Sequence, residues 1–371
     1  MSELQTQHYV EQTISPNKQF DQRLSSRIST QPQSPTKSRR QPNDKRLRQD
    51  LESGSCNYLL RPEFSLSKLQ WLSLTKITDQ IYSSSSLSEN GDPQLLAISD
   101  EYIAVVTSKC YALLFSFQQV LLLKVKWANI TPSTRITALA LSIDSTYLAM
   151  GNSDGAINLY DLKKADPIIT ITPTTAHELQ FDGSHHHIAH LKGSAIRFIS
   201  FIGSRHTGFV SSDDTGVTIF HNGGRSLIGY SCRSKIVFGR YDLANIMTGK
   251  VNYSNTVLDF HLLPIGSKKS LADEMSLISM ITPHSMVVLS LNSELKTHIK
   301  MKKPKISDQS LGMSGCVSWF PATVGDFGRH ENSPMLAYAW SNILGVLEIK
   351  AENNTNQEGE QTAILNVTSK K

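Results

Sequence analysis

The sequence has 371 residues, of which 39% are hydrophobic and 19% charged, and this composition excludes a wholly disordered chain. Its formal net charge of +5 is local, because six of the 37 basic residues and one of the 32 acidic residues lie between Lys37 and Arg48. The rest of the chain carries 31 residues of each sign, so we expect no folded domain with a basic face for nucleic acid.

Residues 1–57 are rich in Ser, Gln, Pro and charge, and no aromatic residue follows Phe20 in this segment. We predict a disordered tail, because such a segment cannot bury enough apolar area to offset its ordering entropy. Its basic stretch has three interpretations: a solvated flank, a nuclear-import signal, or a weak contact with anionic membranes. The membrane contact would use six side chains: Lys37, Arg39, Arg40, Lys45, Arg46 and Arg48.

Residues 58–351 contain short apolar runs separated by Gly, Ser, Asn and Asp, which is typical of an all-β protein. The clearest unit predicts three strands, Thr137–Ser142, Tyr147–Gly151 and Ala156–Leu162. A tight turn at Asp154-Gly155 joins the second and third strands. The unit resembles a WD repeat, with Tyr160-Asp161 at the position where Trp-Asp is usual.

Five further segments repeat this pattern at intervals of roughly 40–60 residues. In a propeller each four-stranded sheet packs a neighbour on both faces, which explains strands as uniformly apolar as Tyr111–Phe115. We therefore predict an all-β, WD40-like β-propeller with six recognisable blades of a probable seven. Residues 352–371 form a polar tail in which only Thr362–Thr368 could supply a strand of an incomplete last blade. The repeated segments are Leu95–Phe117, Ala195–His221, Lys235–Leu263 as a degenerate copy, Ser276–Met301 and Gly315–Ile349.

Motifs for catalysis and for metal or cofactor binding do not occur in this sequence: P-loop, G-x-S-x-G, H-E-x-x-H and EF-hand patterns are all missing. We therefore predict a protein that is not an enzyme, with no catalytic, cofactor or metal site. His186 and His190 have helical i, i+4 spacing and His177 lies nearby, but zinc needs three or four convergent ligands. We interpret this stretch as a solvated loop between blades.

Two other patterns have a structural interpretation. Ser212–Thr218 resembles the Asp-box turn of sialidase propellers, and we interpret it as a hairpin turn closed by an Asx-type hydrogen bond. The tryptophans are interpreted as blade core rather than as a ligand platform: Trp71, Trp319 and Trp340.

Cysteine usage and the N-terminus favour a cytoplasmic protein. Cys56, Cys110, Cys232 and Cys316 are far apart and form no C-x-x-C pair, which suits a reducing compartment. The polar segment Met1–Asn17 has no apolar signal core, so we do not expect a secreted protein.

Five segments, in order, resemble the amino-terminal propeller of the family of vacuolar protein sorting-associated protein eight, over about residues 64–351. Members of this family are subunits of the CORVET endosomal tethering complex. The resemblance implies a non-enzymatic protein, peripheral on endosomal membranes, that binds a GTP-loaded early-endosomal Rab GTPase and other tethering subunits. It would act in endosomal vesicle fusion and in protein transport to the vacuole or lysosome. The segments are Leu66–Trp71, Lys76–Tyr82, Tyr102–Val105, Ile157–Leu162 and Pro334–Ala337.

The resemblance leaves several points open. No short motif marks the Rab-contacting residues, so the partner-binding residues are unknown from the sequence. Family members continue through a helical solenoid to a RING, which the four dispersed cysteines of this sequence cannot form, so a fragment and a short paralogue are both open.

Val106 and Cys110 stand where the family usually has Gly, and a positive φ at Cys110 would cost about 1 kcal/mol. The alternative function is a generic WD-repeat scaffold that binds other subunits without preferring a Rab.

Overall fold

A computed structural model describes much of the chain from Ser73 onward, within a compact unit that comprises Ser73–Lys371. The segment Met1–Leu72, which includes the predicted tail and Trp71, lies outside the described residues. The described ranges are 73–181, 188–203, 207–227, 229–242, 256–266, 270–292, 295–304, 314–324, 331–340, 343–355 and 361–370.

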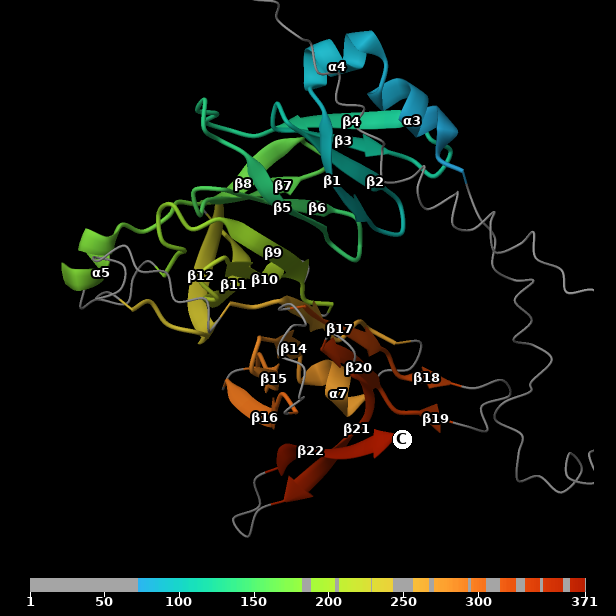
Figure 1. The fold of residues 1–371 in the computed structure, drawn as a ribbon, viewed down its shortest axis with the longest axis vertical. Helices are drawn as coiled ribbons and strands as arrows, with labels where there is room; N and C mark the ends of the chain where they lie inside the picture. Colours follow the sequence, from blue (N-terminus) through green and yellow to red (C-terminus); the bar gives the residue numbers. More distant parts are fainter. Residues whose placement is uncertain are drawn as a thin grey trace, which may run out of the picture. The chain divides into compact units, whose positions relative to one another are not determined.

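Two short helices precede three sheets of four antiparallel strands each (Figure 1). The helices are α3 (Thr75–Ile81) and α4 (Ser84–Asn90). The first sheet has β1 (Pro93–Ile98), β2 (Ile103–Thr107), β3 (Tyr111–Phe115) and β4 (Leu121–Lys126). The second has β5 (Ile136–Leu141), β6 (Tyr147–Asn152), β7 (Ile157–Asp161) and β8 (Asp166–Ile171), followed by α5 (Ala176–Phe181). The third has β9 (Ile196–Phe201), β10 (Gly208–Asp213), β11 (Thr218–Ser226) and β12 (Gly229–Phe238).

Two more four-stranded sheets and one two-stranded sheet complete the described fold. The fourth sheet has β13 (Asp259–Leu262), β14 (Leu277–Ile281), β15 (Ser285–Ser290) and β16 (Lys296–Lys302), with α7 (Leu271–Glu274) between its first two strands. The fifth pairs β17 (Gly315–Phe320), β20 (Met335–Trp340), β21 (Ile343–Thr355) and β22 (Gln361–Lys370) in that order. The hairpin of β18 (Thr323–Val324) and β19 (Glu331–Asn332) lies between β17 and β20 in the chain.

Apolar clusters lie between successive sheets, and these clusters confirm the predicted all-β propeller fold. Leu114 and Val125 of the first sheet pack with Leu148 and Tyr160 of the second, and equivalent clusters join each later pair. Because inner sheets are covered on both faces, their central strands lack the polar alternation of a half-exposed strand. All six residues of β10 and all five of β14 are buried.

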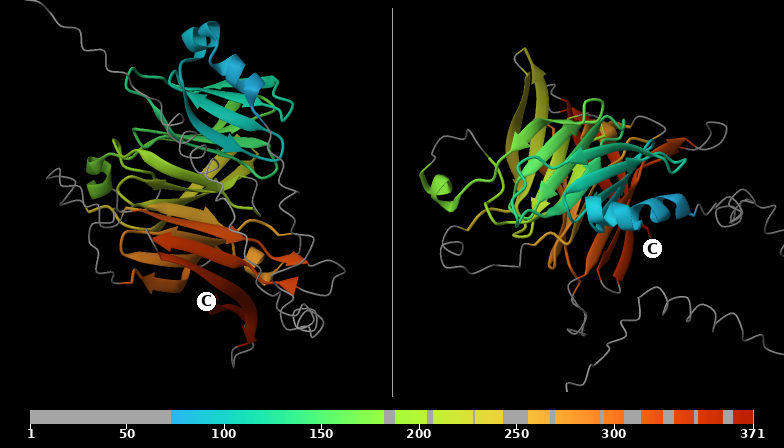
Figure 2. Two further views of the ribbon diagram at one scale, coloured as in Figure 1. Left: turned by 45° about the vertical axis from the view of Figure 1, so that its right-hand side comes forward. Right: turned by 90° about the horizontal axis from the view of Figure 1, so that it is seen from above.

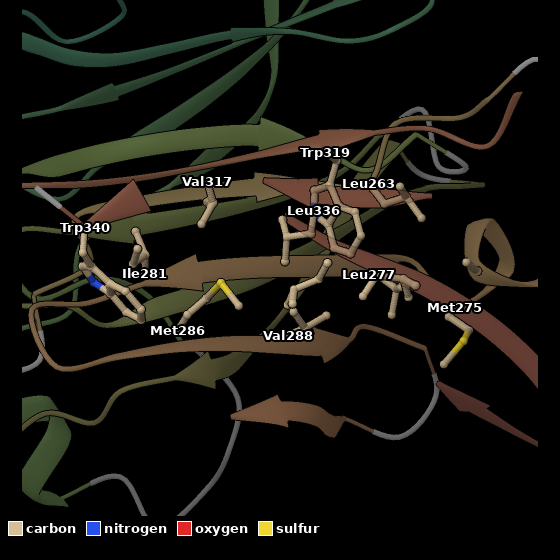
Figure 3. Close-up of a cluster of buried hydrophobic side chains, with 13 residues drawn as sticks. Leu263, Met275, Leu277, Ile281, Met286, Val288, Val317, Trp319, Leu336 and Trp340 are labelled. Carbon is tan, nitrogen blue, oxygen red and sulfur yellow. The ribbon is translucent and has the colours of Figure 1, made fainter. Parts of the chain in front are cut away.

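The fourth and fifth sheets are joined by hydrogen bonds as well as by packing (Figure 3). The indole Nε1 of Trp340 donates to the carbonyl of Thr282 over 2.9 Å, and that of Trp319 donates to the carbonyl of His261 over 3.1 Å. The backbone N–H of Val317 donates to the Asp259 carboxylate over 2.9 Å. Trp319 and Trp340 are 4% and 0% exposed, which confirms that they belong to the core.

A side-chain oxygen at or just after the end of the second strand closes the turn to the third strand in four sheets. Thr107, Asn152 and Thr282 each accept a backbone N–H from their own turn. In the third sheet Asp213 Oδ1 accepts the N–H groups of Thr215 and Val217, both over 3.0 Å. This confirms the Asx-type turn that the sequence predicts, and it gives the repeat a common local mechanism.

The structure corrects one blade boundary. Lys235–Leu263, which the sequence suggests as a degenerate blade, does not form a sheet of its own in the part that the structure describes. Lys235 belongs to β12 and Leu262 to β13, so the segment ends the third sheet and begins the fourth. Thr362–Thr368, the possible terminal strand, lies within β22.

Cys110 has a φ of 61°, so this residue, at a position where the resemblance implies Gly, adopts the left-handed conformation. We predict that Cys110→Gly is more stable than Cys110→Ala by about 1 kcal/mol, because both variants lose the buried thiol but only Ala retains the Cβ clash. The measurement is the free energy of urea unfolding. At Ala112, which is 0% exposed in β3, a Gly substitution should instead destabilise the protein. Cys110→Gly no more stable than Cys110→Ala would contradict the proposed strain.

Candidate functional site

The third sheet contains a chain of buried polar side chains. His190 Nδ1 lies 2.9 Å from Asp213 Oδ2, and His190 Nε2 lies 2.7 Å from Ser211 Oγ. Ser211 Oγ lies 2.8 Å from His221 Nε2, whose Nδ1 lies 2.8 Å from Ser234 Oγ. A carboxylate only accepts, so His190 Nδ1 carries a proton and donates to Asp213, while the Ser211 hydroxyl joins the two histidine rings.

Ser211, His190 and Asp213 have the connectivity of a serine hydrolase triad, but their burial prevents that chemistry. All three side chains are 0% exposed, and His221 occupies the hydroxyl of Ser211 from the other side. A nucleophile must reach a substrate carbonyl, and this one is enclosed by the sheet. The three residues therefore fasten the segment that precedes β9 to β10 and to the turn between β10 and β11.

Burial and hydrogen bonding set the ionisation of this cluster. Burial would raise the pKa of Asp213, but hydrogen bonds and charge from His190, with hydrogen bonds from Thr215 and Val217, hold the pKa below its ordinary value. Burial pushes the pKa of His221 well below its ordinary value, and the nearby His190 adds to this effect. Tyr241 donates to Asp213 Oδ2 over 3.0 Å and accepts the N–H of Leu191 over 3.1 Å.

The solvated loop predicted around His190 is wrong at that residue, because His190 is 0% exposed in the buried cluster. His186 lies outside the described residues, so its pairing with His190 is not tested. Among the residues that the structure describes, no group of three or more His, Cys, Asp or Glu side chains is arranged to hold a metal ion. The buried cluster was missed because its members are distant in sequence. One sequence signal could have identified Asp213: it lies at the end of the second strand of its sheet and accepts a turn N–H there, as Asn152 does in the second sheet.

A partner-binding surface is better sought where apolar side chains remain exposed. Within the described ranges, seven of the fourteen large hydrophobic residues with exposed side chains lie in the short stretch from Tyr82 to Leu122. This stretch contains α4, the first three strands of the first sheet and the start of β4, with Tyr82 just after α3. The seven are Tyr82, Leu96, Ile98, Phe117, Val120, Leu121 and Leu122.

Helix α3 covers only the middle of the outer face of the first sheet, the face turned away from the second sheet (Figures 1 and 2). Ile77 and Ile81 pack against four buried residues, Ile103, Val105, Leu113 and Phe115. Gln119 fixes the start of the helix: its Oε1 accepts the N–H of Lys76 over 3.0 Å, and its Nε2 donates to Ser73 over 2.9 Å. The side-chain amide thus supplies the cap that Leu74, at the N-cap position, does not provide.

A cleft remains on each side of α3. The cleft toward β1 has a volume of about 360 Å³, and its walls include Leu74, Tyr82 and Leu96. The cleft toward β4 has a volume of about 480 Å³ and is bordered by Ser83, Glu89 and Leu121. Leu96 is 59% exposed and Leu121 42% exposed, so each cleft has an apolar side chain accessible at its border. We call this surface the α3 platform.

No described helix has the length and apolarity needed to span a bilayer.

The buried histidines predict a pH dependence of stability. Burial lowers the pKa of His221 and also that of His261, so the unfolded chain binds protons that the folded chain excludes. Unfolding free energy should therefore be constant above about pH 6.5 and fall below it, by at most about 1.4 kcal/mol per pH unit for each histidine. Urea unfolding at pH 7.5, 6.5 and 5.5 measures this. His221→Gln should reduce the slope, whereas the same change at exposed His284 should not; equal slopes in the two variants would contradict the assignment.

Comparisons with known proteins agree with this architecture. A family profile described as Vps8 beta-propeller matches residues 67–371. The vacuolar protein sorting-associated protein 8 of Saccharomyces cerevisiae is 22% identical over 302 residues, covering 78% of this chain and 21% of that protein. The mouse homolog is 24% identical over 287 residues, covering 76% of this chain and 17% of that protein. The chain thus spans about a fifth of the length of these relatives.

Among solved structures, the beta-propeller domain of Myceliophteria thermophila Cps50 (Swd1) is similar over 75% of this chain and 71% of that chain, with 9% identity and a TM-score of 0.43. The match to the family profile extends over most of the sequence, from just before the first helix through the fifth sheet. The chain therefore belongs to the Vps8 beta-propeller family.

Proposed function

We propose that this chain is the propeller region of an endosomal tethering subunit and that it binds a GTP-loaded early-endosomal Rab GTPase. In this role it would act without catalysis in vesicle fusion and in protein transport to the vacuole or lysosome. Membership of the Vps8 beta-propeller family supports the tethering role. The Rab partner and the CORVET complex follow from the family resemblance, and the chain's location on endosomes would follow from these contacts.

The α3 platform is the surface that we assign to the Rab, and the observation that supports it is the pair of clefts lined by the exposed side chains of Tyr82, Leu96 and Leu121. A GTPase orders its switch segments when the γ-phosphate is present, so only the GTP form offers a fixed surface to these clefts. Binding energy in such an interface comes from a few anchors that enter pockets. Leu96 and Leu121 are placed to contact these anchors on opposite sides of α3.

The second candidate function is a scaffold that binds other tethering subunits on the same platform without a preference for a Rab. The exposed apolar surface fits this function equally, so nucleotide dependence distinguishes the two. A separate, weak contact of the six basic tail residues with anionic membranes would act alongside either function.

We predict that full-length protein retains the Rab from a GTP-loaded sample at least about tenfold more strongly than from a GDP-loaded one. Leu96→Asp and Leu121→Asp should each reduce binding of the GTP form about tenfold or more, because a carboxylate would be desolvated in an apolar interface. Binding is measured by pull-down and by biolayer interferometry. Leu344→Asp is the matched control, because Leu344 is 76% exposed and lies on the fifth sheet, away from the platform. This variant should bind the Rab as strongly as the unchanged protein.

Equal binding of the GTP and GDP forms would contradict the Rab proposal and favour the scaffold. Nucleotide-dependent binding that the platform variants leave unchanged would contradict the site but support the partner. Thermal unfolding of each variant shows whether lost binding reflects a lost fold.

A further inference from the structure

The third sheet carries a hairpin that extends beyond its own sheet. Strands β11 and β12 have nine and ten residues, whereas β9 and β10 have six each. Pairing between β10 and β11 ends at Asn222, but β11 continues to pair with β12 as far as Ser226 and Gly229. The last four residue pairs therefore form a two-stranded ribbon, visible as the projecting strands in the right-hand view of Figure 2.

One face of this ribbon is already occupied. Gly223 lies close to Ile169 of the second sheet, and a Cβ at Gly223 would come within 2.9 Å of the Ile169 side chain. Tyr230 and Cys232 are partly buried against the cluster between the second and third sheets. On the opposite face Gly224, Ser231 and Arg233 are exposed, and so is Leu227 at the tip. A two-stranded ribbon adds little core, so its length requires another explanation.

The ribbon ends in a fully exposed apolar side chain. Leu227, at the tip, is 107% exposed, more than any other large hydrophobic residue in the described part of the chain. An isolated exposed leucine on a flat surface is ordinary. A leucine at the end of a projecting hairpin, however, can enter the apolar part of a membrane interface without any rearrangement of the sheets.

Basic residues surround this tip, and acidic residues are excluded from the hairpin. Thr218–Arg240 contains Arg225, Arg233, Lys235 and Arg240 and no Asp or Glu. Arg225 and Arg233 are exposed, and neither forms an ion pair with another described residue. In the strand register Arg225 pairs with Tyr230 and Arg233 with Asn222, which places the two arginines on opposite faces of the ribbon.

We propose that this hairpin tip is a membrane-contact site, in which Leu227 enters the interface of an anionic bilayer while Arg225 and Arg233 contact lipid phosphates and carboxylates. An apolar side chain inserted between cations is the combination that an acidic leaflet recognises. Arg233 lies four residue pairs, roughly 13 Å, behind the last pair of the ribbon, so it stays near the headgroups when the tip enters. The proposal is independent of Rab binding.

Charge and position favour a membrane over a protein partner. A protein pocket for Leu227 would not require cations on both faces of the ribbon, whereas a planar anionic surface contacts both faces at once. Leu227 and two arginines give a weak contact, which suits a protein held on the membrane by several signals. The tail would be one such signal, and its presence on the same chain raises the effective concentration of the hairpin at the surface.

The experiment uses full-length protein in which the six basic tail residues are changed to Gln, so that the tail does not mask the hairpin. Flotation of the protein with phosphatidylcholine vesicles is compared with its flotation with vesicles that also contain about 30% phosphatidylserine. Both measurements are made at about 0.1 M salt. We expect binding to the anionic vesicles only. Leu227→Ser should weaken it about five- to tenfold, and Arg225→Gln and Arg233→Gln about fivefold each.

Two matched controls test position. Leu344→Ser removes an equally exposed leucine on the fifth sheet and should leave binding unchanged. Lys235→Gln removes the same charge from the same hairpin, but at a pair about 20 Å from the last pair of the ribbon, compared with about 13 Å for Arg233, and should have a smaller effect than Arg233→Gln.

Insertion has its own readout. The fluorescence of Leu227→Trp should shift to shorter wavelength on anionic vesicles, whereas that of Leu344→Trp should not shift. No shift at position 227, or equal effects of Leu227→Ser and Leu344→Ser on flotation, would overturn the proposal. A third result would also overturn the proposal: the arginine variants float with anionic vesicles as well as the unchanged protein does, while they lose binding to a single-stranded RNA.

Discussion

Every sheet of this fold must cover two apolar faces, and most of the structure follows from that requirement. The inner sheets meet it by packing against one another in chain order, which is why β6, β10 and β14 contain no exposed residue. At the first sheet no preceding sheet is available among the described residues, and α3 covers part of the free face. A two-turn helix is narrower than a sheet, so apolar area remains open on both of its sides, and this area is the α3 platform.

The same requirement explains where polar groups are tolerated. Buried polar side chains in the third sheet are acceptable because each one is hydrogen-bonded, from Ser234 through His221 and Ser211 to His190 and Asp213. This chain has the connectivity of a catalytic triad in an environment that excludes substrate. Residue types and distances alone would have suggested a hydrolase, whereas burial identifies a structural network.

The two surfaces that we propose for partner binding lie beside or beyond the packed sheets. Gln119, in the turn before β4, holds α3 in place from a loop, and the clefts beside the helix are a consequence of that docking. The ribbon of β11 and β12 likewise extends beyond the strands that make the core. The two surfaces differ in chemistry: the platform is apolar with clefts, while the ribbon is basic with one apolar tip. We therefore assign them to different partners, a GTPase and an acidic leaflet.

The sequence by itself determined the all-β class, the WD-like repeat and the membership of the family, because these depend on local patterns. Apolar runs between Gly and Asp turns, as in Thr137–Leu162, need no tertiary information. The blade boundary near Lys235 was misplaced because β12 and β13 are separated by a long connection that carries no periodic signal.

Only the tertiary structure decided which residues meet. His190, Ser211 and His221 are distant in the chain and carry no motif, so their hydrogen bonds depend on the sheet that brings them together. Charge shows the same division. Outside Lys37–Arg48 the sequence sums to zero, yet the pairing of β11 with β12 places Arg225 and Arg233 on opposite faces of one projecting ribbon that ends at Leu227. A sum over the chain is independent of position, whereas the potential at a surface depends on distance, and only the fold sets the distances.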